Sequence, residues 1–277
     1  MNIDYLIVAG WQRLIPKWLI EHCNKRVIGI HGSPYGIEQG RGRSPQNWAL
    51  LMGKNKFSIS IFQIDEGIDS GDIIDARTFS LSPFDNIRSS YIKAAWLSAH
   101  MIIDAIKNKK IENDQGICQK HNNRYLPQRL PEDGQIDWTL SSNNIYNLIR
   151  ALTKPYPGAY TKISGNKCII WNAIPFDKLE GFDSFIPGQI IKISNGFQEI
   201  LIKTGDAALL ITEYDTMPRE FKSDFCEGLQ FDCFSFSDNI KNIVQRHYEK
   251  YPHYKIQEDL IDFLDSWYDS CNNKKQR

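Results

Sequence analysis

The sequence feature that most constrains the fold is a series of short apolar runs that lead into glycine-rich loops. These runs cover residues 5–9 (YLIVA), 27–30 (VIGI) and 57–64 (FSISIFQI). Helical patterns over 13–22 and 45–52 separate them. The order strand, helix, strand, helix, strand is typical of a parallel α/β sheet, and such a sheet builds its site in the loops at the carboxyl ends of its strands.

The chain beyond residue 80 adds a long helix and then a change of composition. Ser82, Pro83 and Asp85 are typical of a helix start, and the following apolar positions fit one helical face as far as about residue 106. A polar stretch with several prolines follows at 124–140 and predicts a linker.

Short strand patterns with polar breaks follow the linker and favour a small β barrel. The predicted elements are a helix over 141–152, strands over 168–171, 188–193, 199–203 and 208–212, and helices over 238–250 and 256–268. The last helix carries an apolar stripe that favours a docking or dimer face. We therefore expect an α/β core (1–123), a linker (124–140), a barrel-like domain (141–215) and a helical extension of unknown role (216–277).

Composition and charge narrow the classes of function. The 277 residues carry 33 basic and 33 acidic side chains, so no overall positive field favours nucleic acid as a partner. The six cysteines are scattered without a CxxC motif, which predicts buried thiols and no metal site. The N-terminus has no basic segment ahead of an apolar run, and no stretch is apolar enough to span a bilayer, so we expect a cytoplasmic protein.

Two glycine-rich loops each bring one ionisable side chain to the end of an apolar run. His31 ends the run 27–30, and Asp69 lies in the loop 65–72 (DEGIDSGD). A carboxylate that accepts a proton from one imidazole nitrogen fixes the tautomer and leaves the other nitrogen free for general acid or base chemistry. The pattern predicts His31 and Asp69 as a catalytic pair.

Five segments in the same order carry a resemblance to a known family. They are VIGIHGSP (27–34), GRGRSPQNWALLMG (40–53), ISIFQIDEGIDSGDII (59–74), LPEDGQIDW (130–138) and RALTKPYPGAY (150–160). Together they resemble the folate-dependent formyltransferases over about residues 4 to 212. The resemblance implies an α/β core with a small C-terminal domain, and transfer of a formyl group from 10-formyltetrahydrofolate to a primary amine.

The resemblance also implies roles for individual residues. His31 and Asp69 match the catalytic histidine and aspartate, and no metal is implied. The residues that match the segments around the folate are Trp11, Gln12, Arg13, Leu14, Ile15, Ile64, Asp65, Glu66 and Gly67. The predicted substrate contacts are Ser33, Pro34, Tyr35, Arg41 and Arg43, of which the two arginines suit a diphosphate.

One departure from the family's pattern lies inside the predicted site. The family has an asparagine two residues before the histidine, where it donates to the developing oxyanion, but this chain has Gly29. Loss of such a donor costs on the order of 10²–10³ in rate. We expect another donor to take its place, and Gln12, Asn47 or a backbone N–H are the alternatives.

A second departure concerns the first strand. Family members carry several strands and helices before the stretch that matches residues 3–10, so this strand would lie at an apolar sheet edge. A shortened sequence, a partner or second copy that covers the edge, and a degenerate enzyme are the alternatives. We favour the first two.

Three functions remain open for the acceptor. The segments 130–138 and 150–160 look closer to the sugar-nucleotide N-formyltransferases, including the formyltransferase half of the bifunctional aminoarabinose-pathway enzyme. The leading hypothesis is therefore a dTDP- or UDP-linked amino sugar of lipopolysaccharide or O-antigen biosynthesis. Methionyl-tRNA is the alternative acceptor, although it would require a more basic surface. The third alternative is an inactive formyltransferase-like interaction module.

Overall fold

The N-terminal sheet contains four strands, and only its first pair is parallel. The computed structural model describes residues 3–11, 13–112, 116–120, 124–194, 196, 199–219, 225–232 and 234–272. The sheet comprises β1 (Ile3–Val8), β2 (Cys23–Ser33), β4 (Lys56–Gln63) and β5 (Ile73–Ser80), in that order across it. β1 and β2 are parallel, whereas β2, β4 and β5 pair antiparallel.

The α/β class is thus confirmed, but the expectation of an all-parallel sheet is wrong. The helix between β2 and β4 is α2 (Pro45–Leu51). A helix of seven residues is only about 10 Å long, too short to carry the chain back along a strand of eight residues. The chain therefore enters β4 near the end at which it left β2, and β5 follows β4 through the loop 64–72 without a helix.

The strand β1 lies at the edge of this sheet and is less buried than its sequence predicts. None of its residues is fully buried, and over the described part of the chain it pairs with β2 alone. The following helix, α1 (Lys17–Glu21), is also shorter than the predicted span because Pro16 caps it. Leu14 and Trp18 are consequently exposed.

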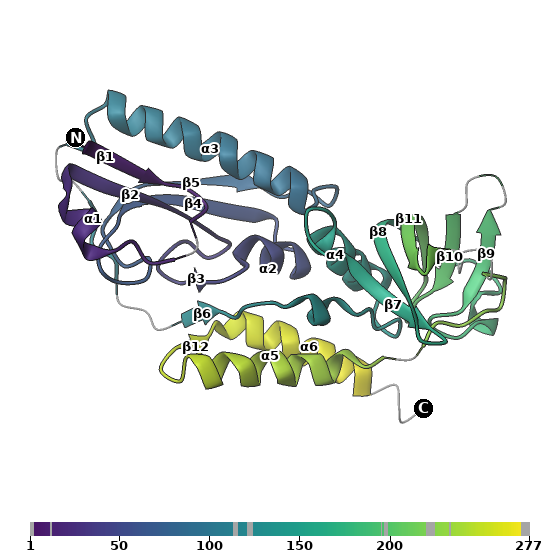
Figure 1. Cartoon of the computed structure of the whole chain (residues 1–277). Helices are drawn as coiled ribbons and strands as arrows, with labels where there is room; N and C mark the ends of the chain where they lie inside the picture. The colour runs from purple at the N-terminus through teal and green to yellow at the C-terminus, as the bar shows by residue number, and fades with distance from the viewer. Residues whose placement is uncertain are drawn as a thin grey trace.

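One long helix covers this sheet. The helix α3 (Ile87–Lys107) lies across the β strands in Figure 1. It begins five residues after Ser82, because the Asp85 side chain accepts from the Ser82 N–H and forms a turn. Asn86 then caps the helix through a reciprocal pair of bonds with Ser89.

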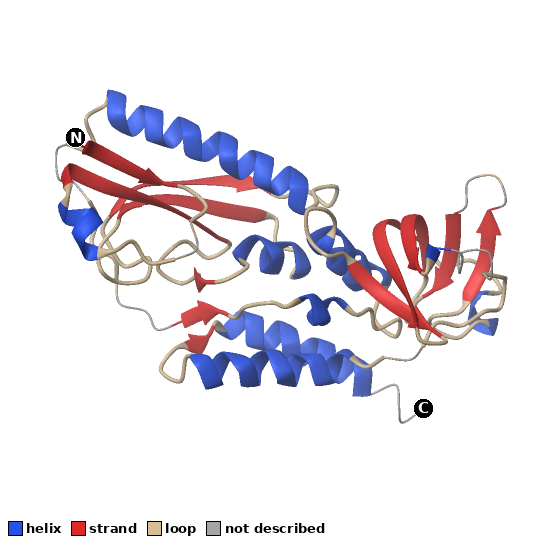
Figure 2. Cartoon of the chain, viewed as in Figure 1, coloured by secondary structure: helices blue, strands red, loops and turns tan. Residues whose placement is uncertain are grey.

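The second sheet contains five antiparallel strands and does not close. It comprises β7 (Ala159–Ile163), β8 (Asn166–Phe176), β9 (Ile190–Ser194), β10 (Glu199–Lys203) and β11 (Ala208–Met217). Their order is β7-β8-β11-β10-β9, and no described residue of β7 pairs with β9, so the predicted barrel is an open sheet (Figure 2). A single-turn 3-10 helix, η1 (Pro131–Gly134), precedes α4, and a second, η2 (Phe182–Ser184), lies between β8 and β9.

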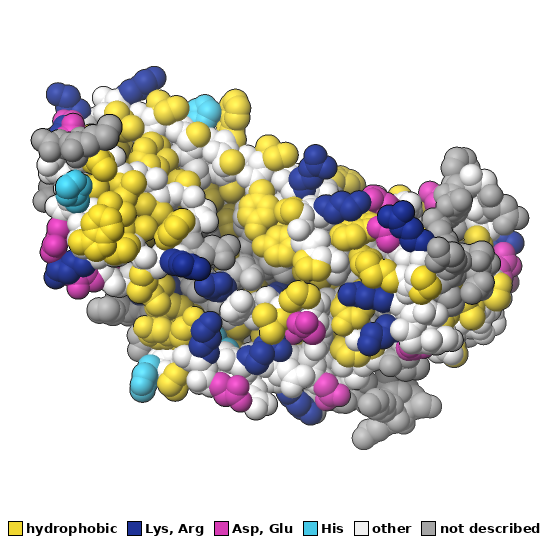
Figure 3. Space-filling model, viewed as in Figure 1, with side chains coloured by type: hydrophobic (Ala, Val, Ile, Leu, Met, Phe, Trp, Pro, Cys, Tyr) yellow, Lys and Arg dark blue, Asp and Glu magenta, His cyan; other side chains and the backbone are white. Residues whose placement is uncertain are grey.

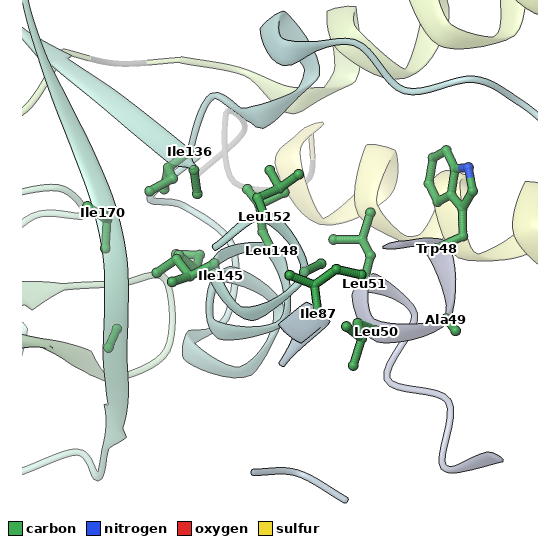
Figure 4. Close-up of a cluster of buried hydrophobic side chains, with 14 of the residues drawn as sticks. Trp48, Ala49, Leu50, Leu51, Ile87, Ile136, Ile145, Leu148, Leu152 and Ile170 are labelled. Carbon is green, nitrogen blue, oxygen red and sulfur yellow. The ribbon is translucent and has the colours of Figure 1, made fainter. Parts of the chain in front are cut away.

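A continuous hydrophobic core joins the two sheets. The helix α4 (Ser142–Leu152) lies between α2 and β8, and Figure 4 shows its side chains meeting those of both neighbours. Leu148 and Ile145 are completely buried there, as are Leu50 of α2 and Ile170 of β8. The N-terminal part and the C-terminal sheet are therefore packed against each other through α4.

The C-terminal helices pack on the N-terminal part of the same chain. They are α5 (Phe236–Lys250) and α6 (Glu258–Asn272), and the strand β12 (Lys255–Ile256) lies between them. β12 pairs with β6 (Arg124–Leu126), and β6 pairs with β3 (Arg41–Gly42). The predicted docking stripe is buried within the chain, with Leu260, Leu264 and Trp267 at most 1% exposed. Over the described residues, no helix has the length and hydropathy required to cross a membrane.

Candidate active site

The structure brings His31 and Asp69 together. His31 lies on β2 opposite Ser60 of β4, and Asp69 lies in the loop that joins β4 to β5. Because β2 and β4 are neighbours, that loop reaches the His31 side chain, and the distance from His31 Nδ1 to Asp69 Oδ2 is 3.2 Å. The other ring nitrogen, Nε2, donates to the carbonyl oxygen of Gly40 at 2.9 Å.

The two partners of His31 define its charge. A carboxylate and a carbonyl can only accept, so each ring nitrogen must carry a proton. Burial is the largest influence and lowers the pKa of His31, but the hydrogen bond and charge of Asp69 and the Gly40 carbonyl outweigh it, so the net pKa is raised. Burial likewise raises the pKa of Asp69, yet His31 and Arg41 bring it below its usual value. The hydrogen-bond geometry and both pKa shifts thus favour an imidazolium beside a carboxylate.

This geometry corrects the expectation of a free imidazole nitrogen. In the structure, the nitrogen that faces away from Asp69 is occupied by the Gly40 carbonyl. His31 can accept a proton only after it has lost one, and a substrate must displace Gly40 to reach Nε2. As it stands, the side chain is a buried positive charge rather than a base.

The Asp69 loop is held by a network that sequence reasoning missed. Asp69 has φ of 49°, in the left-handed region that few residues other than glycine adopt. Gln119 Nε2 donates to the carbonyl oxygens of Asp69 at 2.9 Å and of Gly71 at 2.6 Å. Arg41 Nη2 in turn donates to Gln119 Oε1 at 2.6 Å. Gln119 lies in no motif, so no sequence signal pointed to it.

A cleft of about 600 Å³ opens beside His31 and Asp69. The folate residues expected from sequence that line it are Trp11, Arg13, Leu14, Ile15, Ile64, Asp65 and Gly67. Trp11 and Leu14 are each 62% exposed, which leaves apolar surface at the cleft for a flat ring system. Glu66 does not line the cleft and instead pairs with Lys17 at 2.7 Å. Gln12 lies outside the described residues.

Only one of the five predicted substrate contacts lines the cleft. Arg43 does so and is exposed. Ser33, Pro34 and Tyr35 do not line the cleft. The strand β2 continues through Ser33, and the Ser33 Oγ accepts a hydrogen bond from the Tyr35 N–H. Arg41 is 4% exposed and engaged with Gln119. Substrate contact by these four residues stays a prediction, and in the structure Arg41 supports the Asp69 loop through Gln119.

The neighbouring strand β4 leaves no space for a side chain at Gly29. A Cβ atom at Gly29 would lie 2.6 Å from the Phe62 ring and 3.0 Å from Ile64. Phe62, which pairs directly with Gly29, therefore fills the space next to the histidine strand. Asn47 cannot supply the missing donor, because its Nδ2 donates to the Ala151 carbonyl and its side chain is 1% exposed.

The opposite side of the cleft carries residues that the sequence did not single out. Tyr91 of α3 and Tyr156 after α4 line it, and their hydroxyl oxygens lie 2.6 Å apart. Arg129 lines it from the segment after β6. His247 and Tyr251, at the C-terminal end of α5, complete this wall. Within the described chain, no three His, Cys, Asp or Glu side chains are grouped to hold a metal ion.

Comparison with known proteins identifies the family to which these segments correspond. Residues 1–106 match the sequence model described as formyl transferase, and residues 130–222 match the one described as formyl transferase, C-terminal domain. The helices α5 and α6 lie beyond both matches, although α5 contributes to the cleft.

Two curated relatives show how much of the family's length is present. Methionyl-tRNA formyltransferase from Caldanaerobacter subterraneus subsp. tengcongensis is 30% identical over 77% of this chain and 66% of that protein. The bifunctional polymyxin resistance protein ArnA from Wigglesworthia glossinidia brevipalpis is 35% identical over 69% of this chain and 28% of that protein. The chain thus spans about two thirds of the first relative and just over a quarter of the second.

Solved structures share the fold at lower identity. HypX from Aquifex aeolicus, in complex with tetrahydrofolic acid, has a TM-score of 0.59 at 23% identity, over 76% of this chain and 35% of that one. An N-formyltransferase from Helicobacter canadensis, in complex with folinic acid and dTDP-3-aminofucose, has a TM-score of 0.55 at 18% identity, over 75% of this chain and 72% of that one.

Proposed function

Because the chain belongs to the formyl transferase family, we propose that it transfers a formyl group from 10-formyltetrahydrofolate to the primary amine of a nucleotide-linked amino sugar. The observation that carries the proposal is the charged His31–Asp69 pair at the wall of a cleft that the folate segments also line. The cleft volume of about 600 Å³ is within the range of small-molecule sites.

The residues of the cleft suit the folate cosubstrate. Trp11, Leu14 and Ile15 offer apolar surface on one side, and the loop 64–67 offers backbone groups on another. A flat pterin ring needs both, since its faces are apolar and its edge carries donors and acceptors. The tetrahydrofolate and folinic acid bound by the two solved relatives support this assignment.

His31 acts in this proposal as a positive charge. Attack of a neutral amine on the formyl carbon places negative charge on the formyl oxygen, and a buried imidazolium next to that oxygen opposes the build-up of charge. Asp69 maintains the imidazolium by raising the pKa of His31. In the imidazolium form, His31 stabilises the tetrahedral intermediate. The bond between the formyl carbon and N10 of the folate then breaks, and the proton that the amine loses passes to N10.

The acceptor class rests on two observations. The Helicobacter canadensis structure with dTDP-3-aminofucose supports a nucleotide-linked amino sugar. The equal numbers of basic and acidic residues also give no overall attraction for a nucleic acid. Methionyl-tRNA remains the second candidate, because several curated relatives are methionyl-tRNA formyltransferases.

A transfer assay tests the proposal. The protein is incubated with 10-formyltetrahydrofolate and either dTDP- and UDP-linked amino sugars or methionyl-tRNA, and formylated product is measured by mass spectrometry. We expect product from at least one amino sugar and none with Asp69→Asn. Formylation of methionyl-tRNA alone would establish the second candidate, and no product from any amine would contradict formyl transfer by this chain.

A further inference from the structure

The cleft contains an arginine whose charge is not neutralised by an ion pair. Arg129 Nη1 donates to Asn47 Oδ1 at 3.1 Å, and Nη2 donates to the Asp133 carbonyl oxygen at 2.8 Å. The guanidinium also lies over the Trp48 ring at 5.2 Å. Its Nε is buried without a hydrogen-bond partner among the described residues. Both of these hydrogen bonds go to neutral oxygens, and within the same residues no carboxylate lies at ion-pair distance.

The C-terminal helix α5 explains why Arg129 has no counter-ion. The nearest acidic side chain is Asp133, which is fully buried. Arg246 Nη2 of α5 donates to both oxygens of that carboxylate, at 2.8 and 2.7 Å. The Leu130 N–H also donates to Asp133 Oδ2, at 2.7 Å, so both carboxylate oxygens are engaged. The cluster of Arg129, Arg246 and Asp133 is left with one positive charge in excess.

A half-buried guanidinium without a counter-ion is costly unless a ligand supplies the anion. Burial lowers the pKa of Arg129 to about 10, against the opposing influence of Asp133, so the side chain still carries its charge at neutral pH. Folding an uncompensated charge into a protein is unfavourable, and binding sites are where such charges are retained.

Arg43 places a second cation on the same cleft. Its backbone N–H donates to the Leu126 carbonyl oxygen at 3.0 Å, which fixes it beside the segment that leads to Arg129. Its exposed side chain makes no ion pair with any residue that the structure describes. Figure 3 shows basic side chains in the band between the α/β layer and the C-terminal helices.

We propose that Arg129 and Arg43 bind the diphosphate of the acceptor, and that α5 creates this subsite by pairing Arg246 with Asp133. The inference rests on the proposed function and deepens it. A phosphate group matches guanidinium donors in geometry and charge. The tyrosines of the same wall, Tyr156 and Tyr251, offer ring surfaces for the attached nucleoside.

Direct binding measurements test the subsite without any transfer reaction. The affinities of dTDP, UDP, inorganic pyrophosphate and thymidine are measured by calorimetry for the wild type and for Arg129→Gln, Arg129→Lys and Arg43→Gln. Loss of one charge-assisted contact should weaken dTDP binding by about 10-fold or more. Thymidine, which has no phosphate, should bind with the same affinity to all variants. The affinity for pyrophosphate should fall in the arginine variants, as the affinity for dTDP does.

Two controls separate loss of the subsite from loss of the fold. Arg88→Gln removes an exposed arginine of α3 that does not line the cleft, and it should leave dTDP binding unchanged. Binding of 5-formyltetrahydrofolate should be the same in every variant. If Arg129→Gln fails to fold, the exposed Arg43→Gln and the charge-conserving Arg129→Lys still decide the question.

The outcomes distinguish this inference from the proposed function. Two results would overturn the subsite even if amino sugars are formylated. The first is that the wild type binds none of dTDP, UDP and pyrophosphate. The second is that the arginine variants bind these ligands as tightly as the wild type does. A tRNA acceptor stem that binds through these arginines while nucleoside diphosphates do not would also overturn it. Arginine-dependent dTDP binding without transfer to any amine would support the subsite and contradict only the proposed reaction.

Discussion

The two sides of the cleft differ in how completely their polar groups are paired. On the β2 side, His31 is bonded at both nitrogens, and the Asp69 loop is fastened by Gln119. On the opposite side, Arg43 makes no ion pair within the described chain, and Arg129 has a buried Nε without a partner. Residues of the chain itself hold the paired side in place, whereas we propose that a ligand completes the unpaired side.

The largest expected effect comes from breaking the paired side. We expect His31→Ala and Asp69→Asn each to lower the transfer rate by about 10³-fold, because both remove the positive charge next to the formyl oxygen. Single-turnover kinetics would measure the loss. His100→Ala, on the exposed surface of α3, is the matched control and should transfer normally. Rates within a few-fold of the wild type for either variant would remove the pair from the reaction.

A smaller effect is expected from loosening the support of Asp69. Gln119→Leu removes the donors to the Asp69 and Gly71 carbonyls but alters neither His31 nor Asp69 itself. A displaced carboxylate should lower kcat by about 10- to 100-fold with little change in KM for folate. The pKa of His31, measured by NMR, should fall toward its ordinary value in this variant. An unchanged His31 pKa would show that Gln119 has only a structural role.

Gly29 offers a test of whether the paired side tolerates the family's asparagine. Gly29→Asn places a Cβ atom 2.6 Å from the Phe62 ring, so we expect it to lower the free energy of unfolding by about 1–3 kcal/mol. Urea denaturation would measure the change. Gly196→Asn, where a Cβ atom meets nothing within 4 Å, is the control. Normal stability of Gly29→Asn would mean that Phe62 moves aside easily.

The smallest expected effect is a pH dependence of stability. The folded pKa of His31 lies above its ordinary value of 6.5, so the stabilisation it contributes is full below 6.5 and is lost as pH rises through the folded pKa. The stability difference between the wild type and Asp69→Asn should therefore be larger at pH 6 than at pH 9. Denaturant titrations at the two pH values would measure it, and a constant difference would argue against a charged His31.

The sequence predicted one side of the cleft far better than the other. His31 and Asp69 each follow an apolar run in a glycine-rich loop, a local pattern that the chain order alone reveals. The wall opposite is assembled by long-range contacts, in which Arg246 meets Asp133 and Tyr251 lies across from His31's strand. Periodicity predicted α5 as a helix but carries no information about what the helix packs against.

The errors in the predicted fold also arise from long-range contacts that local sequence does not specify. The helices α2, α3 and α4 begin within a few residues of their predicted positions, because caps and periodicity are local signals. The direction of β4 depends on the end of the sheet at which the chain leaves α2. Closure of the second sheet depends on how β7 and β9 lie relative to one another. Neither is recorded in the residues of the strands themselves.

The short sheet β12-β6-β3 has a consequence for how the protein is made. Its first strand to be synthesised, β3, follows the histidine strand closely, while its last, β12, follows α5. On the ribosome, a nascent chain that ends before α5 already contains His31 and Asp69 but lacks the helix that supplies Arg246, His247 and Tyr251. The cleft therefore gains the wall that contains His247 and Tyr251 late in translation, after His31 and Asp69 have been synthesised.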